Sequence, residues 1–146
     1  MTDTIIKQYT LGFIFDMPLY NVLLIRKERP DWQRGRLNGI GGKVELNERS
    51  ERCIVREVAE ECGLVTSEQD WTKIGNMHGN MWSVDIYAYV HAGDASEAYS
   101  VGDEEIGWYQ ISKLPDNVLT NIPWLIQLSL DKIKNNKFEN CVVRYA

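Results

Sequence analysis

Apolar and polar residues alternate between Tyr9 and Phe15, and this period of two predicts a strand over residues 4–16. A second apolar run, NVLLIRK over residues 21–27, follows the short turn MPLY, so the two strands are expected to pair as a hairpin. Further strands are predicted over residues 71–77, 81–91 and 105–111, with a final edge strand over residues 138–145.

Two segments carry the spacing of helices instead. Residues 50–62 are predicted to be helical, with Ser50 as the N-cap and Gly63 as the residue that ends the helix. Apolar residues at intervals of three and four form one stripe on it: Ile54, Val55, Val58, Ala59 and Cys62. A second helix is predicted over residues 122–134, with Pro123 in its first turn.

Strands combined with two helices of this length predict an α/β fold, a mixed β-sheet covered on both faces, in one domain over residues 1–146. The composition, 44% hydrophobic and 25% charged, is ordinary for a globular protein. The N-terminus MTDTIIKQ lacks the basic-then-apolar layout of a signal peptide. Uninterrupted apolar runs stay well short of the roughly 18 residues of a membrane span, so we expect no membrane partner.

Charge and cysteine content narrow the possible partners. The formal net charge of −5 argues against a nucleic acid polymer or an anionic membrane, but not against a small anionic substrate in a locally basic cleft. The three cysteines are odd in number and form no CxxC pair, which predicts neither a disulfide framework nor a zinc site. We therefore expect a reduced, cytoplasmic setting. The sequence leaves the oligomeric state open between monomer and homodimer.

Carboxylates crowd the first predicted helix. Glu57, Glu60 and Glu61 lie three and four apart on one face, where like charges repel by roughly 0.2–0.5 kcal/mol per pair. A solvated acidic face, with Arg56 and Glu60 as an ordinary ion pair, is one interpretation. A metal site is the other, because the acidic face borders the buried stripe and a glycine-rich turn carrying Glu48 leads into it. Ligands that are oxygen alone suit Mg²⁺ or Mn²⁺.

Residues 42–64 read GKVELNERSERCIVREVAEECGL and resemble the Nudix box, in which fixed Gly, Glu and Arg-Glu-apolar-x-Glu-Glu-x-Gly-apolar positions stand at set intervals. Every fixed position is filled: Gly42, Glu48, Arg56, Glu57, Val58, Glu60, Glu61, Gly63 and Leu64. The resemblance implies an α/β/α sandwich and a metal-dependent hydrolase of a nucleoside diphosphate linked to another group.

The resemblance also implies a role for each residue of the box. The implied metal ligands are Glu57, Glu60, Glu61 and the backbone carbonyl of Gly42. Arg56 would orient Glu57. Glu48 would hold a metal-bound water or help deprotonate it, and the choice of general base between Glu57 and Glu48 stays open.

Two further positions bear on the metal site. Family members often place one more acidic ligand in a later loop. In the stretch Asp103-Glu104-Glu105, alignment on Trp108 allows Asp103 or Glu104, of which we favour Glu104, and a solvated acidic turn is the alternative. Asn47 stands where the family often has glycine. Asn is the non-glycine residue that best tolerates positive φ, so the loop is expected to be unchanged.

The segment RGRLNGIGGKV over residues 34–44 resembles that of MutT-like members of the family. Asn38 matches a base-reading asparagine there, and Asn121-Ile122-Pro123 resembles an Asn-x-Pro whose asparagine reads a purine edge. An amide suits this role because it presents a donor and an acceptor together. The alternatives are a turn residue for Asn38 and a helix N-cap for Asn121.

Nearby side chains extend this predicted substrate site. Arg34, Arg36 and Lys43 are expected to contact phosphates, and Trp32 to stack on a base or close the cleft, unless it only anchors its loop.

The substrate is expected to be a small nucleotide. Subfamilies acting on ADP-ribose or diadenosine polyphosphates favour a proline or a tyrosine after the box, and residues 79–82, GNMW, carry neither. This favours a nucleoside triphosphate, an oxidised or other purine, cut to the monophosphate and pyrophosphate with Mg²⁺, or Mn²⁺ as substitute. Hydrolysis of a dinucleotide or nucleotide sugar is the alternative, followed by a non-catalytic nucleotide-sensing module.

Overall fold

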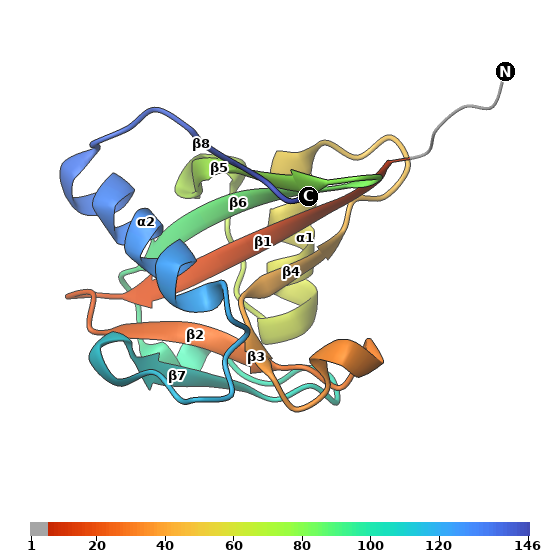
Figure 1. Ribbon diagram of the computed structural model, residues 1–146. Coiled ribbons are helices and arrows are strands. Elements are labelled where there is room, and N and C mark those ends of the chain that lie inside the picture. Colours follow the sequence, from red (N-terminus) through yellow and green to blue (C-terminus); the bar gives the residue numbers. More distant parts are fainter. Residues whose placement is uncertain (1–5) are drawn as a thin grey trace, which may run out of the picture.

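The computed structural model describes residues 6–146. Within that range the strands form one mixed sheet in the order β3-β2-β1-β6-β5-β8, with β4 paired to β1 and β7 to β2 (Figure 1). The strands are β1 (Lys7–Asp16), β2 (Asn21–Arg26), β3 (Leu37–Asn38), β4 (Ile40–Lys43), β5 (Thr72–Gly79), β6 (Trp82–His91), β7 (Ile106–Gln110) and β8 (Cys141–Arg144). The helices are α1 (Ser50–Cys62) and α2 (Ile122–Asn135).

The alternating pattern correctly predicted the centre of this sheet. β1 and β2 form an antiparallel pair, with Ile14 opposite Leu23, which confirms the hairpin. β1 also pairs in parallel with β6 along its whole length, so both edges of β1 are hydrogen-bonded to neighbouring strands. The predicted first strand began at residue 4, and residues 4 and 5 lie outside the described part of the chain.

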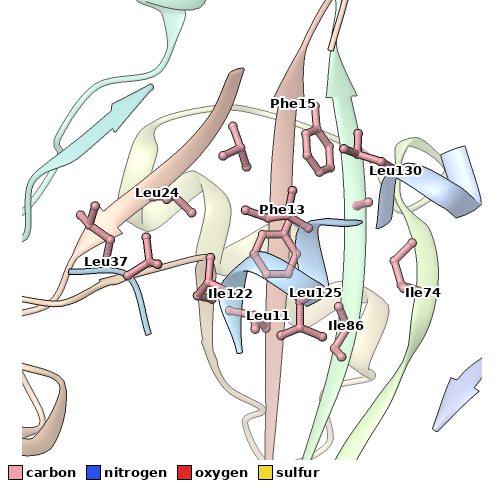
Figure 2. Packing of buried hydrophobic residues seen from close by; sticks show 14 of the residues in the cluster. Leu11, Phe13, Phe15, Leu24, Leu37, Ile74, Ile86, Ile122, Leu125 and Leu130 are labelled. Atoms are coloured by element: carbon pink, nitrogen blue, oxygen red, sulfur yellow. The ribbon is translucent and has the colours of Figure 1, made fainter. Parts of the chain in front are cut away.

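Each helix covers one face of the sheet (Figure 1), which confirms the α/β/α arrangement. Ile122 and Leu125 of α2 pack on Phe13 of β1 on one side (Figure 2). Ile54 and Val58 of α1 belong to the core on the other side. Full burial of each of these apolar side chains contributes about 1.5–3 kcal/mol to stability. The apolar stripe of each helix therefore determines which face of that helix packs on the sheet.

Three local predictions were wrong. Arg49, not Ser50, holds the N-cap position of α1, and the Ser50 hydroxyl lies 2.8 Å from the Tyr87 hydroxyl instead. Ala59 is exposed. Cys53 is buried instead, because the buried face of α1 includes the side that lies against Thr10 of β1 and Gly42 of β4. The glycine segment forms two short strands, β3 and β4, which were not predicted because they have too few residues to show alternation.

Two helix ends follow the sequence. Gly63 ends α1 with φ 74°, a left-handed conformation that glycine adopts without strain. Pro123 lies in the first turn of α2 as predicted. None of the helices in residues 6–146 has the length and apolarity needed to cross a bilayer.

Candidate active site

The glycine segment brings the backbone against the carboxylate helix. β4 pairs with β1, with Gly42 opposite Thr10, and it also contacts α1. A Cβ built on Gly42 would lie 2.4 Å from Cδ of Glu57, so any side chain at this position would displace the Glu57 carboxylate from its place. Glycine at this position therefore lets the Glu57 carboxylate rest against the backbone whose carbonyl was predicted to be a metal ligand.

The turn between β4 and α1 aims Glu48 inward. Asn47 adopts φ 63°, as expected for a residue standing in place of glycine. The next residue, Glu48, accepts a hydrogen bond from the Glu45 backbone N–H at 3.0 Å, and its side chain is only 10% exposed. The left-handed turn thus delivers a nearly buried carboxylate to the end of the glycine segment.

Arg56 joins the carboxylates to one another. Its Nε and Nη2 donate to the two oxygens of Glu48 at 2.7 and 3.0 Å, and Nη2 also donates to the Lys43 carbonyl at 3.0 Å. Its Nη1 donates to Glu57 at 2.9 Å and to Glu60 at 3.1 Å. The guanidinium lowers the pKa of Glu48 to about 2, and in return the pKa of Arg56 rises above its ordinary value. All three carboxylates are therefore held around one cation.

Glu61 differs from these three because none of the hydrogen bonds that Arg56 donates reaches it. Its Oε2 is buried and has no hydrogen-bond partner within residues 6–146. Burial, and then the neighbouring Glu57 carboxylate, raise the pKa of Glu61 to about 9. A buried carboxylate with an unpartnered oxygen beside another carboxylate fits a cation site, because a cation supplies the missing partner.

The carboxylates of the described chain do not yet surround one point. As they stand in residues 6–146, no three His, Cys, Asp or Glu side chains gather closely enough to hold a metal ion. Arg56 Nη1 donates hydrogen bonds to Glu57 and Glu60, whereas Oε2 of Glu61 is buried without a hydrogen-bond partner among residues 6–146. Holding an ion among Glu57, Glu60 and Glu61 therefore requires side-chain rotations on α1.

Glu104, the acid favoured as an extra ligand, anchors the loop after β2. It accepts hydrogen bonds from Lys27 Nζ at 3.2 Å and from the backbone N–H of Glu28 at 2.7 Å. Its side chain is 12% exposed, whereas that of Asp103 is 67% exposed and pairs with Arg29. Of these two acids, Glu104 is the one turned inward. Its charge also contributes to raising the pKa of Glu61.

A cavity of about 690 Å³ opens on the opposite side of Gly42 from α1, and Gly42 itself lines it. Among residues 6–146 the charged residues of its lining are two lysines, Lys27 and Lys43, with no acid. Its aromatic residues are Tyr9, Trp32, Trp82 and Tyr145. The cavity lining therefore combines two cations with aromatic rings, and through Gly42 it borders the Glu57 carboxylate.

The predicted substrate residues divide into two groups. Asn38, Lys43, Trp32 and Asn121 line the cavity. Arg34 and Arg36 are not among its lining residues. The Arg34 guanidinium instead bonds within its own loop, to Asp31 at 2.8 Å.

Sequence reasoning missed several lining residues, among them Lys27, Gln33, Met77 and Trp82. Only Lys27 carried a usable signal, a cation at the end of an apolar run.

The two asparagines present their amides differently. Asn38 Oδ1 accepts from the Gly39 N–H at 2.8 Å and its Nδ2 donates to Gln33 Oε1 at 3.1 Å, so its orientation is fixed. Asn121 occupies the N-cap position of α2, but its side chain makes no capping hydrogen bond. Its Nδ2 lies 3.7 Å from Met77 Sδ in the cavity wall. The cap interpretation of Asn121 is therefore wrong for its side chain.

Comparison with known proteins identifies the family of this chain. Residues 9–127 match the family model described as NUDIX domain. No curated protein matches the chain.

Solved structures share the fold. One, from a study of MutT of Aliivibrio salmonicida and Vibrio cholerae, has 22% identity and a TM-score of 0.66, covering 86% of this chain and 98% of the other. A MutT/nudix family protein from Enterococcus faecalis has 15% identity and a TM-score of 0.75, covering 91% of this chain and 64% of the other. The NUDIX domain of Shewanella oneidensis NrtR, solved with ADP ribose, has 13% identity and a TM-score of 0.72, covering 92% and 91%.

Proposed function

This chain belongs to the Nudix family, and on that premise we propose that it is a MutT-like member that hydrolyses a purine nucleoside triphosphate to the monophosphate and pyrophosphate. Family membership supports the broader statement, a hydrolase acting on pyrophosphate bonds with a divalent metal ion. The choice of a triphosphate, of a purine and of Mg²⁺ is the proposal.

One observation carries the proposal: Gly42 belongs to both halves of the site. On one side its Cα faces the Glu57 carboxylate, and on the other it lines the cavity that holds Lys27 and Lys43. A nucleotide whose phosphates lie at these lysines has its anhydride bonds beside the carboxylates. The aromatic and amide side chains of the cavity lining are then left for the base.

The carboxylates divide the chemistry between them. We assign Glu57, Glu60, Glu61 and the Gly42 carbonyl to hold Mg²⁺, with Glu104 as a further ligand. When bound there, Mg²⁺ neutralises charge that develops on phosphate oxygens and lowers the pKa of a water molecule. Arg56 positions Glu57, and Glu48 or Glu57 takes the proton from the attacking water.

On the substrate side we assign Lys43 and Lys27 to the phosphates, because both line the cavity and an ammonium binds phosphate oxygens as a point charge. Asn38 and Asn121 are assigned to the polar edge of the base. Arg34 and Arg36, which lie outside the lining, are assigned only to early attraction of the anion.

Hydrolysis of a dinucleotide or a nucleotide sugar is the second candidate, because the NrtR domain with the same fold was solved with ADP ribose. The absence of proline or tyrosine in residues 79–82 favours the triphosphate.

Product analysis separates the two candidates. The purified protein is incubated with Mg²⁺ and a panel of canonical and oxidised nucleoside triphosphates, ADP-ribose and a diadenosine polyphosphate. Release of pyrophosphate and a nucleoside monophosphate supports the proposal. If ADP-ribose is the only substrate and yields AMP and ribose 5-phosphate, the second candidate replaces the triphosphate proposal. If the protein binds nucleotides without turnover, and the Glu57→Gln variant binds them equally well, the protein is a nucleotide sensor.

A further inference from the structure

Tyr145, the residue that follows the last strand β8, lines the cavity although it lies beyond residues 9–127, the part that matches the family model. β8 runs parallel to β5, with Gly75 opposite Cys141. A Cβ on Gly75 would lie 1.9 Å from the Cys141 carbonyl oxygen, so the two backbones are in direct contact. Just beyond β8, the Tyr145 N–H donates to the His78 carbonyl at 2.8 Å. β8 is the last strand in the sheet order (Figure 1), so this hydrogen bond fixes the backbone of Tyr145 beside β5 at that edge.

The ring of Tyr145 forms part of an aromatic wall. It lies against Trp82 of β6, with ring centroids 5.4 Å apart and planes inclined by 47°. Both residues line the cavity, and Tyr145 keeps 37% of its surface exposed. Aromatic faces bind planar rings, and stacking on a nucleic-acid base contributes about 1–3 kcal/mol per base.

Two hydrogen-bond donors at this wall have poor partners. The Tyr145 hydroxyl lies 4.0 Å from Met77 Sδ, and Asn121 Nδ2 lies 3.7 Å from the same sulfur. A thioether sulfur is a weak acceptor, so neither donor is well satisfied. A phenol and an amide that share one weak acceptor at a cavity wall retain capacity to bind a polar ring edge.

We propose that Tyr145 determines base specificity: its ring stacks on the base with Trp82, and its hydroxyl binds the polar edge of the base together with Asn121. This inference rests on the proposed nucleotide substrate but not on the number of its phosphates. The proposed function assigns the phosphates to Lys27 and Lys43, so Tyr145 is expected to act on binding of the base and not on bond cleavage.

The test uses two variants of Tyr145 in the full chain. Tyr145→Ala removes the ring and hydroxyl, and Tyr145→Phe removes the hydroxyl alone. Val142→Ala is the matched control, because Val142 is on β8, is 60% exposed and does not line the cavity. For each protein kcat and KM are measured over triphosphates of all bases and ADP-ribose, together with the melting temperature.

We expect Tyr145→Ala to raise KM for the preferred nucleotide by about tenfold or more, with kcat within about twofold. Tyr145→Phe should raise KM by about threefold to tenfold and reduce the preference for one base over the others. Val142→Ala should leave KM and the ranking unchanged.

Other outcomes overturn the inference in distinguishable ways. If both Tyr145 variants change kcat/KM for all substrates by the same factor, and the melting temperature falls with it, Tyr145 only anchors β8. If wild type cleaves ADP-ribose but no triphosphate, the proposed function fails, while the KM shift for ADP-ribose still decides the role of Tyr145. If wild type neither cleaves nor binds any nucleotide of the panel, both fail.

Discussion

Arg56 donates two parallel hydrogen bonds to the Glu48 carboxylate, Nε to Oε2 at 2.7 Å and Nη2 to Oε1 at 3.0 Å. Such a forked pair is directional as well as charged, so it fixes the turn before α1. Because the folded protein lowers the pKa of Glu48 from 4.5 to about 2, the pair stabilises the fold fully above about pH 4.5. That contribution is lost as pH falls from 4.5 toward 2.

We therefore predict a specific pH dependence in the metal-free protein. Near pH 7, Glu48→Gln should be less stable than wild type by about 1–3 kcal/mol, and the difference should shrink as pH falls toward 2. Urea unfolding at several pH values in the presence of a chelator measures it. Glu45→Gln is the control, because Glu45 is 65% exposed and 3.6 Å from Arg56. Equal pH profiles for wild type and Glu48→Gln would contradict the role of the pair.

The metal assignment predicts two linked losses. Glu57→Gln and Glu60→Gln should each reduce kcat by about a hundredfold or more, since a metal contributes several kcal/mol to the transition state. Millimolar Mg²⁺ should also raise the melting temperature of wild type, and this rise should be smaller in Glu60→Gln. Glu51→Gln, in the first turn of the same helix and 45% exposed on its side chain, should retain both properties. Near-normal turnover of Glu60→Gln would remove Glu60 from the metal site.

The turn at Asn47 allows a test of backbone geometry. With φ 63°, Asn47→Gly should keep the turn and full activity, because glycine adopts this conformation freely. A β-branched residue is strained there, so Asn47→Val should lose about 1–2 kcal/mol and shift Glu48. Melting temperature and kcat of the two variants decide the matter. Equal values for glycine and valine would mean that the turn does not position Glu48.

How far the sequence predicted this site follows from how local each part is. Glu57, Glu60 and Glu61 are three and four residues apart on one helix, so their neighbourhood on α1 follows from a single stretch of chain, while their role as metal ligands stays a prediction. The cavity wall is different. It joins Met77 of β5, Trp82 of β6 and Tyr145, which follows β8. These residues meet only because β5 pairs with both β6 and β8.

Two smaller errors have local causes that the pattern could not express. Ser50 was expected to cap α1, but its hydroxyl has a tertiary partner in Tyr87, at 2.8 Å. Ala59 has the right spacing for the buried stripe, yet Cys53 is buried instead, where its Sγ lies 3.2 Å from Thr10 Oγ1. Periodicity gives the width of a stripe, and the facing strands decide which edge of it is covered.

The last prediction concerns Asn121, whose side chain leaves the N-terminus of α2 uncapped and lies in the cavity wall. A capping side chain contributes about 1 kcal/mol to stability, so its loss lowers the folded fraction and weakens all substrates together. A base contact acts differently, because its loss leaves one ring edge unpaired and raises KM for the preferred base alone. We expect the second result for Asn121→Ala, with KM for that base raised by about threefold to tenfold and the melting temperature almost unchanged. Asn135→Ala, at the exposed other end of α2, is the matched control and should alter neither. The measurement is kcat/KM over a panel of triphosphates, with thermal unfolding in the same buffer. A lowered melting temperature with an unchanged substrate ranking would assign Asn121 to the helix and not to the base.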